Sequence, residues 1–326
     1  MALSTTKQTS GQGVQATPTP KQQGRRWSRY SSRTFYLFVS PWLLGFLLLT
    51  LIPLLYALGL SFTDWDGLSP HWHIVGLANY INIFQDSEAL GSLARTLFYT
   101  ALTVPLSIAG GLGLAVMLNQ RLKVAGFFRT VFYVPSLVPV VATAIMWKLI
   151  FDRDAGALNA VLELVHIPTI TWLVDPTAFY ALIILMLWGM GGGMVISLAG
   201  LQGIPSELNE AAVVDGANRW QAFRHITLPM LSPVLFFQTV TGVITALQIL
   251  VQPLLLAQTN SISQVTQIPH SNLLYIVYVY QQFTNMQHLG YGAALLWVFF
   301  VVILLITLLV LRSGRFWVYY EVDGDN

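Results

Sequence analysis

The sequence predicts an all-α integral membrane protein that crosses the bilayer six times. Hydrophobic residues make up 55% of its 326 residues and charged residues only 9%, and its mean hydropathy is +0.63. A soluble domain is about one quarter charged, and a single soluble core stops growing at about 250–300 residues. Because the chain lacks the polar surface that water requires, the lipid bilayer is its expected solvent.

Six apolar stretches are long enough to cross a hydrocarbon core, which needs about 20 apolar residues in a helix. They cover approximately residues 36–62, 96–118, 130–151, 178–200, 230–257 and 291–311. The first stretch follows several arginines, as a signal peptide does, but it is far longer than a signal core of about 7–15 residues. We therefore expect an uncleaved first span.

The distribution of Lys and Arg predicts the orientation, because cytoplasmic loops carry an excess of both. Basic residues gather in the N-terminal tail, after span 2, in residues 201–229 and after span 6: Lys7, Lys21, Arg25, Arg26, Arg29, Arg33, Arg121, Lys123, Arg129, Arg219, Arg224, Arg312 and Arg315. Residues 258–290 carry no formal charge. Both termini are therefore expected in the cytoplasm. The predicted organisation is a disordered cytoplasmic tail (1–33), a transmembrane domain (34–312) and a cytoplasmic C-terminal tail (313–326).

Several chemistries are disfavoured by what the chain lacks. None of the six stretches contains Asp or Glu, although ion-coupled carriers generally need a carboxylate within the membrane. The phosphate-binding pattern G-x-x-x-x-G-K-[ST] and the metal motif H-E-x-x-H are both absent from the sequence. With no cysteine, thiolate metal sites and cysteine nucleophiles are excluded. We expect no metal site, no cofactor and no catalytic residue in this chain.

A neutral polar stripe marks span 5. Five residues follow one another at spacings of 3, 4, 3 and 4, which places them on one face of a helix: Gln238, Thr241, Thr245, Gln248 and Gln252. Such a stripe contacts either another helix or a solute in water, and its pattern favours neither reading. If it lines a path, amides and hydroxyls suit an uncharged, hydroxyl-rich solute better than an ion.

A charged segment, "NEAAVVDGANRWQAFRHITLPMLSP" at 209–233, interrupts these apolar runs. Residues 201–229 are predicted to form two short helices joined at residues 215–217, with Ser206 capping the first, Gly216 allowing the turn and Pro229 ending the second. Trp220, Phe223 and Thr227 would form an apolar stripe on the second helix. Such a pair either docks a soluble partner or lies flat at the lipid interface.

The same segment resembles the EAA loop of binding-protein-dependent ABC importer permeases. The matching residues are Glu210, Ala211, Ala212, Gly216, Ile226, Leu228 and Pro229. In that family the loop is the coupling helix that sits in a groove of the ATPase subunit, and a glycine marks its bend. The resemblance implies that the ATPase contacts also include Asp215, Ala217, Trp220 and Phe223.

The resemblance extends over most of residues 36–312 and points to carbohydrate-uptake permeases of the maltose and glycerol-phosphate type, and to the first of their two permease subunits. "VGLANYINIF" (75–84), "VFYVPSLVPVVATAIMWKLIF" (131–151) and "GYGAALLW" (290–297) each resemble a segment of such permeases. The family usually shows "T-x-G-G-P" after span 5, where this chain reads "LLLAQTNSISQ".

The resemblance implies a type I ABC importer permease fold in a prokaryotic cytoplasmic membrane. It implies a homologous second permease, two ATPase subunits that bind ATP and Mg²⁺, and an extracytoplasmic solute-binding protein; nucleic acid is not an expected partner. The family's sugar contacts lie on the equivalents of spans 4 to 6, which adds Trp188, Gly189 and Ser197 to the span 5 stripe. The alternatives are an ion-coupled carrier, a permease for a non-sugar solute and a membrane-embedded enzyme.

Overall fold

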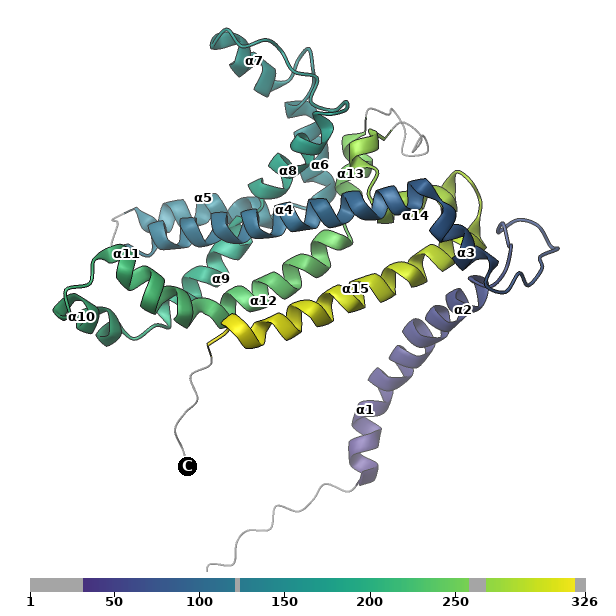
Figure 1. Cartoon of the computed structure of the whole chain (residues 1–326), viewed down its shortest axis with the longest axis horizontal. Helices are drawn as coiled ribbons and strands as arrows, with labels where there is room; N and C mark the ends of the chain where they lie inside the picture. The colour runs from purple at the N-terminus through teal and green to yellow at the C-terminus, as the bar shows by residue number, and fades with distance from the viewer. Residues whose placement is uncertain (1–31, 121–123, 258–267, 320–326) are drawn as a thin grey trace, which may run out of the picture. The chain divides into compact units, whose positions relative to one another are not determined.

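The computed structural model describes residues 32–120, 124–257 and 268–319. Within these ranges the regular structure is helical, and β pairing is limited to an isolated bridge between Thr63 and Ile74. The chain divides into two compact units, Met1–Leu54 and Leu55–Asn326 (Figure 1). The predicted N-terminal tail and most of the C-terminal tail lie outside the described residues.

The first unit contains a very apolar helical stretch. It comprises α1 (Ser32–Phe46), the π-helical turn η1 (Leu47–Leu51) and the beginning of α2 (Ile52–Leu60). Phe35–Leu60 is long and apolar enough to cross a membrane, as predicted for residues 36–62. Its large side chains are exposed, with Phe38 at 78% and Leu49 at 80%, and a bilayer would cover them.

The second unit contains three further unbroken helices of membrane-spanning length, Ser87–Leu118, Arg219–Leu247 and Leu289–Trp317. They are α4 (Ser87–Leu118), the continuous run of α11 (Arg219–Ala222), π-helical η2 (Phe223–Thr227) and α12 (Leu228–Leu247), and α15 (Leu289–Trp317). Two bent pairs complete the set, so the described part of the chain contains four candidate spans, or up to six if each pair counts as one span.

Each bent pair lies where the sequence predicted one span, at residues 130–151 and 178–200. In the first, α5 (Ala125–Leu137) and α6 (Val140–Ile150) meet at 101°. Pro139 lies at the bend and holds the preceding Val138 in extended backbone (ψ 132°), because a proline ring disfavours helical geometry in the residue before it. In the second pair, α8 (Ala178–Trp188) and α9 (Gly191–Gln202) meet at 42° around Gly189.

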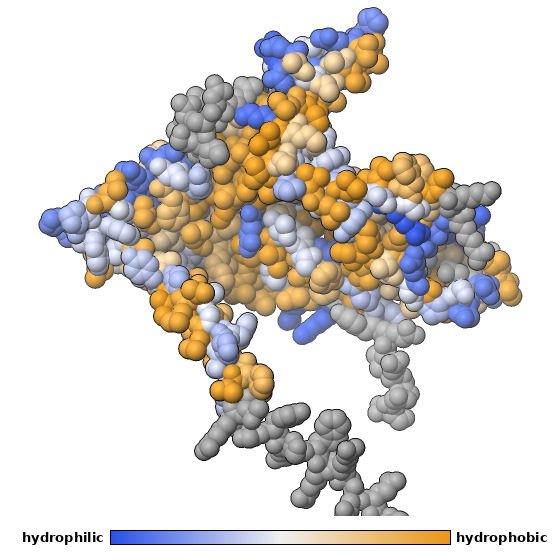
Figure 2. Space-filling model, turned by 180° about the vertical axis from the view of Figure 1, so that it is seen from behind, coloured by the Kyte–Doolittle hydropathy of each residue, from blue (hydrophilic) through white to orange (hydrophobic). Residues whose placement is uncertain are grey.

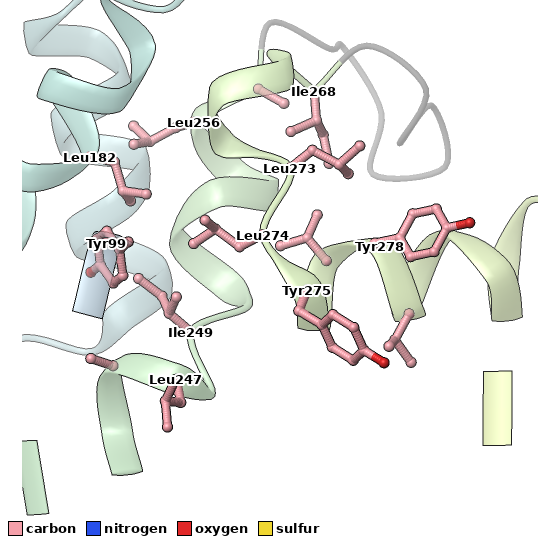
Figure 3. Packing of buried hydrophobic residues seen from close by; sticks show 14 of the residues in the cluster. Tyr99, Leu182, Leu247, Ile249, Leu256, Ile268, Leu273, Leu274, Tyr275 and Tyr278 are labelled. Atoms are coloured by element: carbon pink, nitrogen blue, oxygen red, sulfur yellow. The ribbon is translucent and has the colours of Figure 1, made fainter. Parts of the chain in front are cut away.

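The helix expected across residues 230–257 is interrupted, which corrects the prediction of a single five-residue face. α12 ends at Leu247, and α13 (Val251–Leu256) begins after three non-helical residues. A continuous helix would hold Pro253 in its interior, whereas a new start at Val251 places Pro253 in the first turn, where its missing N–H costs nothing. The side chains of Leu247, the last residue of α12, and of Ile249, within the break, are both buried (Figure 3).

Shorter helices, which sequence analysis did not predict, connect the long ones. They are α3 (Ala78–Gln85), α7 (Ala157–Leu164), the 3₁₀ turn η4 (His270–Asn272) and α14 (Tyr275–Thr284). Asp86 ties three elements together: its carboxylate accepts N–H groups at the start of α4 and the hydroxyl groups of Tyr278 on α14 and Tyr291 on α15.

The core of the second unit joins α4, α8, α13, α14 and α15. Tyr275 stacks on Phe299 with ring centroids 4.6 Å apart, among aliphatic side chains that Figure 3 shows in part. A smaller cluster packs α4 on α9, where Gly111 approaches the backbone of Met194. On the face seen in Figure 2, hydrophobic residues cover most of the middle and hydrophilic residues gather towards the ends, as a bilayer requires.

Asp175 anchors η4 and gives the fold a predictable response to acid. Its carboxylate accepts the backbone N–H groups of His270 (2.7 Å) and Ser271 (3.0 Å). Burial opposes ionisation, but the hydrogen bonds from Ser271 and His270 outweigh it and lower the pKa of Asp175. The stabilisation is therefore present above the ordinary Asp pKa and is lost as pH falls through the lowered value.

We expect the protection factors of the His270 and Ser271 amides, measured by hydrogen exchange from neutral pH downwards, to fall only below the ordinary pKa of Asp, about 3.9, because the pKa of Asp175 in the folded protein is lowered. Asp175→Asn should reduce protection already at neutral pH and remove this pH dependence. Equal protection in the two proteins across the range would contradict the anchoring role.

Candidate transport cavity and coupling segment

A cavity of about 270 Å³ lies between α4, the α8–α9 pair and α12. Its polar lining groups come from Tyr99, Thr103, Ser107, Gln238, Thr241 and Thr245. Its apolar lining includes Val104, Ile108, Met186, Leu187, Ile196 and Ala246. Among the residues that the structure describes, no Asp, Glu, Lys, Arg or His lines the cavity, so these residues form a neutral, partly hydroxylated wall.

The α4 side of this cavity was missed by sequence analysis. Tyr99, Thr103 and Ser107 follow one another at intervals of four, which places them on one helical face. The signal was therefore available in span 2, at the same kind of spacing as in span 5. Thr103 donates its hydroxyl to the Tyr99 carbonyl (2.7 Å), which leaves the lone pairs of Thr103 to accept from a solute.

The α12 side divides between packing and lining. Gln238 is buried and donates through Nε2 to Ser197 Oγ (2.9 Å) and to the Gly193 carbonyl (3.2 Å), both on α9. Thr241 and Thr245 each donate to a carbonyl one turn earlier on their own helix, both at 2.8 Å. Gln238 therefore joins two helices and also lines the cavity.

The remaining predicted path residues do not line this cavity. Gln248 is exposed at the C-terminal cap of α12, and Gln252 lies beyond the break, on α13. Trp188 packs edge to face on Trp147, with centroids 6.0 Å apart. Gly189 lies at the α8–α9 bend. Ser197 is fully buried, and its hydroxyl accepts a hydrogen bond from Gln238.

The Gln238–Ser197 pair gives a testable stability effect. Gln238→Leu should destabilise the protein by about 1 kcal/mol, since interhelical hydrogen bonds in membrane proteins contribute about 0.6–1.7 kcal/mol. The measurement is the thermal unfolding midpoint in detergent. The double variant Gln238→Leu with Ser197→Ala should lose less than the sum of the single variants, because it leaves no buried hydroxyl unpaired. Strict additivity would mean that the two side chains do not interact.

The charged segment forms the predicted helix–turn–helix. α10 (Ser206–Val214) and α11 are joined by a turn in which Gly216 has a φ of +81°, a conformation that glycine adopts freely. Two details differ from prediction. Pro205 occupies the N-cap and Ser206 forms no cap, whereas Asn218 caps α11 in a reciprocal capping box with Gln221.

Pro229 does not end the second helix, contrary to prediction. The chain continues from α11 through η2 into α12, and Pro229 lies in the first turn of α12. In η2 the Leu228 N–H bonds to the carbonyl of Phe223, five residues earlier. This π-helical turn lies directly before Pro229. The helix therefore continues through the proline although Pro229 has no N–H to donate.

The predicted ATPase-contact residues differ in exposure. Glu210, Ala211, Asp215, Gly216 and Trp220 are exposed. Ala212 is buried, and Ala217, Phe223, Ile226, Leu228 and Pro229 are half-buried. On α10 the apolar Val213 and Val214 are 70% and 86% exposed, and sequence analysis did not single them out. The exposed surface of this segment therefore comprises most of α10, the Gly216 turn and the residues Arg219 and Trp220 of α11.

The chain is similar in sequence to permease subunits of known transport systems. Residues 107–316 match the family model of the binding-protein-dependent transport system inner membrane component. A probable ABC transporter permease protein, YesP of Bacillus subtilis, is 40% identical over 291 residues, covering 88% of this chain and 92% of the relative. The trehalose/maltose transport system permease protein MalF of Thermococcus litoralis is 32% identical, covering 86% of this chain and 93% of the relative.

The fold itself is found in a solved structure. A chain of a bacterial alginate ABC transporter, crystallised with an alginate pentasaccharide-bound periplasmic protein, superposes with a TM-score of 0.73 at 20% identity. The superposition covers 87% of this chain and 94% of that chain. Together with the apolar helices described above, these matches make the protein a multi-pass inner membrane protein. It belongs to the family of binding-protein-dependent transport system inner membrane components, the permease subunits of ABC transporters.

Proposed function

We propose that this chain is the transmembrane subunit of an ATP-driven importer that moves a neutral sugar, oligosaccharide or polyol into the cytoplasm. The observation that carries the sugar class is the cavity between α4, α9 and α12, whose lining residues are uncharged. Hydroxyl and amide groups exchange hydrogen bonds with sugar hydroxyls, and the apolar wall accepts the C–H faces of a sugar ring. The 32% identical relative named for trehalose and maltose supports the same class.

A neutral solute fits this cavity better than an acidic one. The structural neighbour is named for alginate, an acidic polysaccharide, and an acidic solute would call for a cation in the path. The lining of this cavity contains no cation. At about 270 Å³ the cavity also lies just below the usual range of ligand sites, about 300–1,000 Å³, so a second permease subunit would supply the facing wall.

The proposed topology has six spans, counting each bent pair as one, in a type I ABC importer permease fold with both termini in the cytoplasm. The positions of the basic residues support it: Arg219 and Arg224 lie at the start of the span that ends at Leu247, and Arg312 and Arg315 lie in the last turns of α15. The α10–α11 pair would then face the cytoplasm.

The proposed partners are a homologous second permease, two ATPase subunits and an extracytoplasmic solute-binding protein. Closure of the ATPases on ATP would pull the α10–α11 pairs of the two permeases together. Since α11 continues through η2 into α12, the pull would reach a wall of the cavity directly. The helices would rock from an inward-facing to an outward-facing arrangement, and the binding protein would deliver solute to the cavity.

Uptake into proteoliposomes containing the complete complex tests the proposal. We expect uptake of a neutral oligosaccharide that depends on ATP, on the ATPase subunits and on the binding protein. Uptake driven by an ion gradient without the ATPases would identify an ion-coupled carrier instead. ATP-driven uptake of a solute other than a sugar or polyol would retain the permease and reject the sugar class, and chemical conversion of the solute by this chain alone would identify an enzyme.

A filling substitution tests the cavity. Ser107→Phe places a ring into the lining and should lower uptake at least about tenfold, because small changes in the volume of a binding pocket cost about 10–200-fold. Leu106→Phe is the matched control, since Leu106 is exposed on the same helix and does not line the cavity. Equal uptake by both variants, at equal membrane levels, would exclude this cavity from the path.

A further inference from the structure

A second cavity, which we call the inner slot, lies between α4 and the start of the α11–α12 helix. Its volume is about 570 Å³, and it is lined by Ala109, Leu112, Gly113, Val116, Arg219, Trp220 and Phe223. The α4 residues belong to the last third of that helix, and Figure 1 shows α11 near the same end. The slot therefore opens where α4, a helix of membrane-spanning length, meets the charged segment at 209–233.

The wall of the inner slot is largely apolar. Trp220 stacks on Phe223 with ring centroids 5.7 Å apart, and Trp220 is 66% exposed. On the facing helix, a Cβ added to Gly113 would meet no atom within 4 Å. The Trp220–Phe223 pair on α11 and η2 thus faces α4 of the same chain across the slot. The exposed Val213 and Val214 of α10 do not line the slot.

Arg219 adds one positive charge to this apolar wall. Its side chain is exposed, and no Asp or Glu oxygen of the described residues lies within 4.0 Å of its guanidinium. The ion pairs that the described chain does form involve residues 64–95 and 270, at other elements. A guanidinium binds phosphate through two parallel hydrogen bonds, and it keeps its charge at the membrane surface.

We propose that the inner slot binds one anionic phospholipid, with its phosphate on Arg219 and an acyl chain along Leu112, Gly113 and Val116. This inference rests on the proposed function for its orientation, which places Arg219 at the cytoplasmic leaflet. That leaflet supplies anionic lipids, and the apolar wall formed by α4 lies at acyl-chain depth. A water-soluble partner such as an ATPase does not reach that depth, whereas a lipid is always present there.

Occupancy of the slot would act on coupling. The lipid would fill the space between α4 and the Trp220–Phe223 pair, and so would hold the beginning of the α11–α12 helix against a cavity-lining helix. The activity of the complex would then depend on the anionic lipid content of the membrane, while its solute specificity would not.

The test uses the complete complex in nanodiscs and counts bound phosphatidylglycerol by native mass spectrometry. Arg219→Gln should weaken binding of one phosphatidylglycerol about fivefold, the effect of one cation near an anionic lipid, and Gly113→Leu should block it by filling the slot. Arg224→Gln and Gly126→Leu are matched controls: Arg224 is exposed outside the slot, and a Cβ at Gly126 also meets open space. Unchanged binding in both slot variants would overturn the proposal.

Two further arms identify the occupant. Phosphatidylcholine and inorganic phosphate should not compete with phosphatidylglycerol; equal competition by phosphate would mean a free-anion site and would reject the lipid. A photoreactive phosphatidylglycerol should label residues 109–116 of this chain. If the lipid instead labelled the second permease and not residues 109–116, a helix of that subunit would fill the slot and the proposal would be rejected. These readouts need no transport, so ATP-driven uptake with failed lipid binding rejects the slot alone, and failed uptake rejects the proposed function.

Discussion

Gly216→Trp is expected to abolish ATP-dependent uptake and transport-coupled ATP hydrolysis while the protein still inserts into the membrane. Gly216 has a φ of +81°, and a Cβ added to it would meet no atom of this chain within 4 Å. Backbone strain should therefore cost only about 1–3 kcal/mol, and the larger effect would come from the indole entering the space that the proposed ATPase subunit would occupy. The measurements are uptake and stimulated ATPase activity in proteoliposomes.

Gly216→Asn is the matched control for strain, because Asn tolerates positive φ better than other residues that carry a Cβ. We expect Gly216→Asn to retain most of the uptake. Retained coupling in Gly216→Trp would show that the turn faces no ATPase, and equal loss in both variants would assign the effect to the backbone conformation.

Gly191→Ala is expected to destabilise the fold by about 3 kcal/mol or more. A Cβ at this position would lie 1.8 Å from the Phe132 carbonyl oxygen and 2.6 Å from its carbon. The clash is with backbone atoms of α5, so α5 and α9 would have to move apart. We expect the destabilisation to lie at the upper end of the usual cost of overpacking, which is about 1–3 kcal/mol. The measurement is the thermal unfolding midpoint of the purified protein in detergent.

Gly192→Ala, one residue away on the same helix, provides the control. Its Cβ would lie 3.6 Å from the Cβ of Ser136, an ordinary contact. Because Ala favours a helix over Gly by about 0.5–1 kcal/mol, this variant should be as stable as the natural protein or slightly more stable. Similar unfolding midpoints in the two variants would contradict the close approach of α5 and α9.

Local patterns predicted much of this architecture. The apolar runs predicted where the membrane helices lie, and the charged segment predicted two short helices with a turn at Gly216. The EAA pattern alone predicted the family, because its residues stand at fixed spacings within about twenty positions. Hydropathy, turn residues and motif spacing are all properties of neighbouring residues, so a sequence displays them directly.

The predictions failed where contacts between distant segments decide the geometry. Span 5 breaks after Leu247, where Leu247 and Ile249 join a cluster that also contains Tyr99 and Leu274. Pro253 disfavours a continuous helix, but these distant contacts decide where the break lies. Gln252 therefore leaves the stripe. Two local assignments were also wrong: Pro205 occupies the N-cap position predicted for Ser206, and the helix continues through the π-helical η2 past Pro229.

By itself the sequence determined that the chain lives in a bilayer, roughly where it crosses, and to which family it belongs. Only the tertiary structure decided which side chains share a cavity: Tyr99, Thr103 and Ser107 meet Thr241 and Thr245 across more than a hundred residues of chain. It also placed Arg219 beside an apolar wall of α4. The physical reason is that hydropathy and turn preference act locally along the chain, whereas a cavity exists only where separately formed helices pack and leave space between them.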